Sequence, residues 1–118
     1  MIDNSIFVFD TRKGFARFIR LNFSNNYSIS TCTLRKNIEE YKLENYRFAF
    51  IIINDYEEMV DFLTIKKNVK YVFAGSTLPE VNKLLLEMTE IVYLDLEVVK
   101  KKTIQEITAS LKFFELNI

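Results

Sequence analysis

Short apolar runs alternate with amphipathic stretches along the whole chain. Five runs have the length and composition of β-strands, at residues 5–10, 27–33, 47–54, 69–74 and 91–99. Each is followed by a stretch whose apolar residues recur every three or four positions, as on the buried face of a helix. These helical faces are Phe15, Phe18, Ile19 and Phe23; Leu34, Ile38 and Tyr41; Met59, Val60 and Leu63; Leu78, Val81, Leu84, Leu85 and Met88; and Ile104, Ile107, Leu111 and Phe114. The pattern predicts one α/β domain over residues 1–118, built from five strand–helix units.

The five predicted strands differ in polarity, and this difference suggests their order in the sheet. Residues 5–10, 47–54 and 69–74 are almost continuously apolar, as expected for strands covered by helices on both faces. Residues 27–33 are half polar and residues 91–99 alternate, which is typical of strands at sheet edges. With right-handed crossovers, we therefore expect a three-layer, doubly wound parallel sheet of order 2-1-3-4-5.

Composition removes several classes of function. The 118 residues include 16 Lys and Arg against 16 Asp and Glu, so the basic footprint of a nucleic-acid-binding domain is missing. The absence of His excludes His-based catalysis and His metal ligands. The single Cys32 cannot form an internal disulfide, which favours the reducing cytoplasm, and no apolar run is long enough to span a membrane. No pair of nucleophile and base is visible, so we do not expect an enzyme.

Polar residues gather where a sheet of this order binds ligands, at the carboxyl ends of strands 1, 3 and 4. They are Asp10, Thr11, Arg12 and Lys13 after the first strand, Asn54 and Asp55 after the third, and Gly75, Ser76 and Thr77 after the fourth. Asp10 ends a buried apolar strand, so its carboxylate must be solvated or paired.

With these residues in these places, the chain resembles the receiver domains of bacterial response regulators, which have a flavodoxin-like fold, over nearly its whole length. The resemblance implies acids that hold Mg²⁺ after strand 1, an Asp after strand 3 that accepts a phosphoryl group, and a hydroxyl after strand 4. Asp10 matches the first acid, and Asp55 matches the phosphoacceptor and a further Mg²⁺ ligand. Ser76, or alternatively Thr77, matches the hydroxyl.

The departures from the receiver pattern are equally specific. Thr11 stands where the second acid is expected, and residues 93–97 lack the Lys that the family carries after strand 5. Arg12 and Lys13 add positive charge that could pair with Asp10 or Asp55 in place of a metal. We therefore interpret the chain as a degenerate receiver, or pseudo-receiver, without the usual Mg²⁺-dependent phosphorylation.

Each candidate residue also has a purely structural interpretation. Asp55 with Glu58, and Thr77 with Glu80, fit capping boxes that begin helices. Arg12 and Lys13 fit solvated loop charges, and Cys32 has no activating neighbour in the sequence.

Three functions remain open from the sequence. The first is a stand-alone signalling module that binds a protein partner, such as a sensor kinase or a downstream effector. A homodimer through strand 5 and the last helix is a related expectation, because Phe113, Leu116 and Ile118 are apolar outside the helix's core stripe. The second is a response regulator phosphorylated on Asp55. The third is a flavodoxin-type binder of a phosphate or small molecule, for which residues 11–14 offer a weak phosphate loop.

Overall fold

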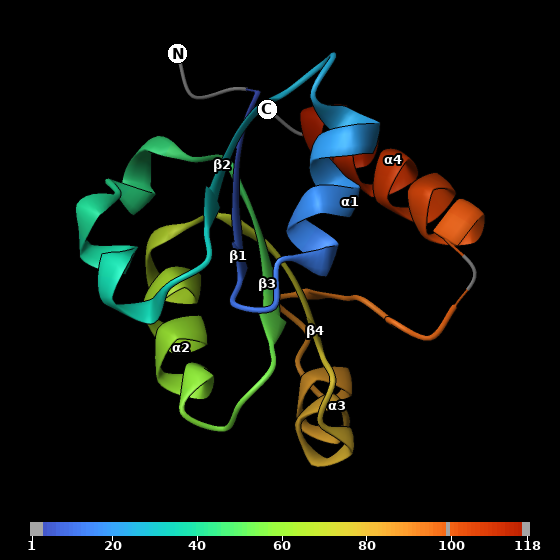
Figure 1. The fold of residues 1–118 in the computed structure, drawn as a ribbon. Coiled ribbons are helices and arrows are strands. Elements are labelled where there is room, and N and C mark those ends of the chain that lie inside the picture. Colours follow the sequence, from blue (N-terminus) through green and yellow to red (C-terminus); the bar gives the residue numbers. More distant parts are fainter. Residues whose placement is uncertain (1–3, 99, 117–118) are drawn as a thin grey trace.

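The computed structural model describes residues 4–98 and 100–116, and it shows a five-stranded parallel sheet with helices on both faces (Figure 1). The strands are β1 (Ser5–Asp10), β2 (Ser28–Cys32), β3 (Phe48–Ile53), β4 (Tyr71–Ser76) and β5 (Val92–Tyr93). The helices are α1 (Gly14–Phe23), α2 (Glu58–Asn68), α3 (Pro79–Leu86) and α4 (Lys100–Leu116), with two 3₁₀-helices, η1 (Arg35–Glu40) and η2 (Leu43–Asn45). The strand order is β2-β1-β3-β4-β5, which confirms the predicted flavodoxin-like α/β fold.

Two apolar layers, one on each face of the sheet, form the core. Along β1, Phe7 and Phe9 pack toward α2 and α3, whereas Ile6 and Val8 pack toward α1 and α4. Figure 1 shows α1 and α4 together on one side of the strands, with α2 and the 3₁₀-helices on the other. This strict alternation of side chains decides which polar residues meet at the ends of the strands.

The connection after β2 differs from the predicted helix. It consists of η1 and η2, with Tyr41 in an extended conformation between them. The interruption lets the rings of both Tyr41 and Tyr46 contact Phe7, at centroid distances of 5.1 and 5.3 Å. The Tyr41 hydroxyl also donates to the carbonyl oxygen of Thr31. Packing against β1 therefore outweighs the helical spacing of Leu34, Ile38 and Tyr41.

The fifth strand is much shorter than predicted. Only Val92 and Tyr93 belong to β5, because the chain turns at Asp95, whose Oδ1 accepts a hydrogen bond from the Glu97 amide. Leu94 lies so close to Gly75 that a Cβ at Gly75 would overlap the Leu94 carbonyl oxygen. Val99, the last residue of the predicted strand, lies outside the described residues.

Two of the predicted helix faces are also partly wrong. Val60 and Leu63 of α2 are exposed, and the buried apolar residues of this helix are Phe62 and Ile65. Leu84 of α3 is likewise exposed. None of the helices in the described part of the chain combines the length and the hydropathy that a membrane span requires.

Candidate functional site

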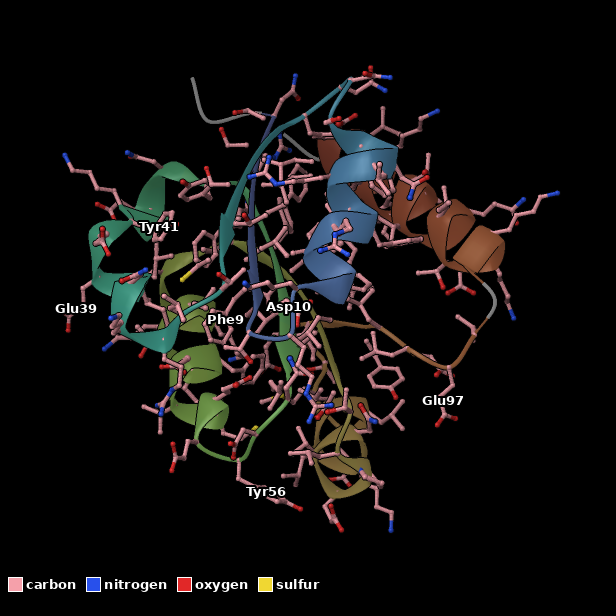
Figure 2. The ribbon with its side chains drawn as sticks, viewed as in Figure 1. Phe9, Asp10, Glu39, Tyr41, Tyr56 and Glu97 are labelled. Atoms are coloured by element: carbon pink, nitrogen blue, oxygen red, sulfur yellow. The ribbon has the colours of Figure 1, made fainter. Side chains whose placement is uncertain are left out.

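The carboxylate of Asp10 lies buried at the end of β1, beside the start of α1 (Figure 2). Its Oδ2 accepts hydrogen bonds from the backbone amides of Phe15 (2.8 Å) and Ala16 (3.2 Å). Its Oδ1 accepts from the Arg12 amide (3.2 Å) and from Nδ2 of Asn54 (2.8 Å). Two carboxylate oxygens offer about four lone-pair positions, so these four donors use the full capacity of the group.

The local sequence explains why α1 needs this carboxylate. Lys13, at the N-cap position, has a left-handed backbone (φ 71°) and no side-chain bond to the helix. The first turn of α1 contains no acidic residue either. Asp10 therefore supplies the acceptor for the unpaired amides and the negative charge that the N-terminal end of a helix favours.

Asn54 and Glu58 extend this arrangement to the loop between β3 and α2. Glu58 is buried, and its Oε1 accepts from the backbone amide of Asn54 (2.9 Å). Its Oε2 accepts from the Thr11 hydroxyl (2.8 Å). We call Asp10, Thr11, Asn54 and Glu58 the loop network, because these four residues join the β1–α1 and β3–α2 loops.

The sequence pattern places Asn54 among the polar residues at the strand ends without assigning it a partner, and it predicts Glu58 only as half of a capping box. The residue in contact with Asp10 is Asn54, because Asp10 and Asn54 continue the α1-facing positions of their strands. Asp55 comes one residue later and is exposed, with no side-chain hydrogen bond or ion pair to any described residue. Because β1 and β3 are apolar on both faces, the sequence carries no signal of this alternation.

Ser76 is buried, and its hydroxyl is already engaged. It donates to the Ile53 carbonyl oxygen (2.6 Å) and accepts from the Leu78 amide (2.9 Å), so it links the ends of β3 and β4 to the start of α3. Thr77 is exposed beside it.

Both predicted capping boxes are wrong. The N-cap positions belong to Glu57 and Leu78, and neither side chain caps its helix. Glu58 instead reaches back to the Asn54 amide, so the acid predicted to close the first box supports the loop network.

Arg12 and Lys13 are exposed, and neither forms an ion pair with Asp10 or Asp55 in the part of the chain that the structure describes. The expected pairing is therefore not formed. Backbone amides and Asn54 compensate the charge of Asp10 instead. Within residues 4–98 and 100–116, no three acidic or Cys residues come together in a way that would hold a metal ion.

Burial raises the pKa of the Cys32 thiol, so Cys32 stays protonated and unreactive near neutral pH.

A cavity of about 380 Å³ opens beside the loop network, between the start of α1 and the loop from β5 to α4. Its walls are mostly apolar and include Phe15, Phe18, Ile52, Leu96 and Val98. Its polar lining includes Asp10, Arg12, Asn54, Thr77 and Asp95. The cavity lies at the carboxyl ends of the strands, the position at which sheets of this order bind ligands.

Comparison with known proteins adds no family. No protein-family model matches the chain, and no curated protein matches its sequence.

Replacing Asp10 should destabilise the fold far more than replacing Asp55. In Asp10→Asn an NH2 group replaces one carboxylate oxygen, so a donor faces N–H donors that bond to that oxygen in wild type. Hydrogen bonds to a charged group contribute about 1.5–3 kcal/mol each. We expect the free energy of unfolding to fall by about 2–3 kcal/mol in urea titrations followed by circular dichroism. The matched variant Asp55→Asn changes an exposed group and should stay within about 0.5 kcal/mol of wild type. Equal losses of unfolding free energy in the two variants would contradict the structural role of the Asp10 carboxylate.

Proposed function

We propose that the protein is a receiver-like signalling module that works through protein–protein contacts without Mg²⁺-dependent phosphorylation. The observation that carries this proposal is the hydrogen bond from Asn54 to Asp10. At the end of β3, the position facing the acid of β1 holds an amide, and an amide is neither a phosphoacceptor of the carboxylate kind nor an anionic metal ligand.

The state of Asp10 supports the same conclusion. Mg²⁺ binds through carboxylate oxygens and retained water. The oxygens of Asp10 already accept four hydrogen bonds from the chain, and their charge lies against the start of α1. A cation would have to displace these donors, which would uncap the helix. Asp55 is too exposed to supply the enclosed, multi-ligand environment that phosphoryl transfer uses.

The phosphate-binding alternative meets the same obstacle. A phosphate loop uses free amides at the start of a helix. In α1 the amides of Phe15 and Ala16 are bonded to Asp10, so an anion would compete with a carboxylate already in place.

For the contact surface we propose the edge of the sheet formed by α3 and β5. Strand β5 ends the sheet, and α3 beside it exposes Leu84 (55%) and Leu86 (62%). Leu116 of α4 is also exposed, but the end of that helix lies near Tyr27, which precedes β2 at the other edge. Phe113 is also largely exposed, whereas Ile118 lies outside the described residues. An edge strand beside the exposed leucines of α3 offers backbone pairing and apolar area to a partner or to a second copy of the chain.

The metal-binding part of the proposal is tested by Asn54→Asp. This substitution sets a carboxylate against Asp10 beside Glu58, so repulsion should destabilise the fold until a divalent cation joins the acids. We expect the melting temperature of Asn54→Asp to rise with millimolar Mg²⁺ and to fall again with EDTA. The melting temperature of wild type should stay unchanged.

The control uses wild-type protein with Mg²⁺ and beryllofluoride, a phosphoryl mimic, followed by amide NMR. Saturable shifts near Asp10, Asp55 and Ser76 that vanish in Asp55→Ala would reject our proposal and favour the phosphorylated regulator.

The contact surface is tested by self-association. If two copies pair through this edge, Leu84→Glu or Leu86→Glu should weaken the dimer about tenfold or more in sedimentation experiments, because burying a charge costs more than 1.4 kcal/mol. Leu34→Glu is the matched control, since Leu34 is exposed next to β2 at the opposite edge. A wild-type chain that stays monomeric at every concentration would reject the homodimer, and equal effects of all three changes would reject this surface.

A further inference from the structure

The cavity beside the loop network contains a polar atom that the chain leaves without a partner. Nδ2 of Asn54 is held by Asp10, so the free end of the amide is Oδ1. No described residue donates to this oxygen. Every buried side-chain polar atom among the described residues has a hydrogen-bond partner. Because Oδ1 of Asn54 has none, this oxygen is not one of the buried atoms and stays accessible to solvent. Asn54 is only 7% exposed and lines the cavity, which makes the cavity the space that this oxygen faces.

The surroundings of this acceptor are apolar and aromatic. Phe15 and Phe18 form one wall with ring centroids 5.6 Å apart, and Leu96 and Val98 lie across from α1 on the loop before α4. A volume of about 380 Å³ falls in the lower part of the range of small-molecule sites. Such walls favour a flat, apolar ligand, and an acceptor surrounded by them favours a ligand that brings a hydrogen-bond donor.

Charge further narrows the class of ligand. The cavity is lined by two acidic residues, Asp10 and Asp95, and by one basic residue, Arg12. Two amides in the first turn of α1, those of Phe15 and Ala16, are already bonded to Asp10. An anion would therefore meet two acidic residues against one basic residue, and it would have to compete with Asp10 for the amides of Phe15 and Ala16.

We infer that this cavity binds a small, neutral aromatic molecule whose N–H or O–H group donates to Oδ1 of Asn54. The site lies in the chain itself, so this inference goes beyond the proposed contact role and does not depend on any partner. Occupation would bring the loop before α4 and the start of α1 into contact with one ligand, next to the loop network.

The test uses indole as the probe and benzofuran as its match, because benzofuran has the same fused-ring shape with oxygen in place of the N–H group. Indole should produce saturable NMR shifts at the Asn54 side-chain amide and at the backbone amides of Phe15 and Leu96. Benzofuran should bind about fivefold more weakly, which corresponds to one hydrogen bond.

A cavity-filling variant provides the second measurement. Val98→Trp should abolish the indole shifts, whereas Val60→Trp, the same change at an exposed position of α2, should leave them intact. The comparison of indole with benzofuran on wild-type protein keeps the test decisive if Val98→Trp does not fold. Absence of saturation by indole, equal affinity for the two probes, or stronger shifts with inorganic phosphate or flavin mononucleotide would each overturn the inference.

Discussion

The carboxylate of Asp10 against the first amides of α1 is the interaction on which the site depends. A charge at the end of a buried strand is costly unless donors surround it, and here Phe15, Ala16, Arg12 and Asn54 provide four. Three of the donors are backbone amides, so the charge holds the start of the helix in place. The fourth extends to β3 and through Glu58 to the start of α2. A single buried anion therefore fixes two loops that in other proteins of this architecture are free to bind ligands.

The same interaction decides which chemistry is accessible. A carboxylate that already accepts four hydrogen bonds within the chain is a weak ligand for a cation, and an occupied helix start is a weak site for an anion. What stays open is the oxygen of the Asn54 amide, a neutral acceptor among aromatic side chains. The polar groups at the ends of the strands therefore hold the loops together instead of binding ions, and the exposed leucines of α3 belong to the surface that we propose for contacts.

The strand order could be predicted from the sequence because polarity differs between central and edge strands, and this difference follows from burial alone. The 3₁₀ connection could not be predicted, because it depends on contacts of the Tyr41 and Tyr46 rings with Phe7. These residues are far apart in the sequence and meet only in the folded sheet. The short β5 depends on the turn at Asp95, whose side chain accepts a hydrogen bond from the Glu97 amide. Asp10 could be identified as a polar end to a buried strand, but its partner could not. One residue separates Asn54 from Asp55, and only the alternation of side chains along β3 distinguishes them.

The most direct test of the account is a double-mutant cycle between Asp10 and Asn54. The free energy of unfolding is measured in urea for wild type, Asp10→Ala, Asn54→Ala and the double variant. A hydrogen bond between a buried carboxylate and an amide predicts a coupling energy of about 1–3 kcal/mol, so the double variant should lose less stability than the two single losses together. Losses that add to within about 0.5 kcal/mol would show that the two residues act independently, and would contradict the account.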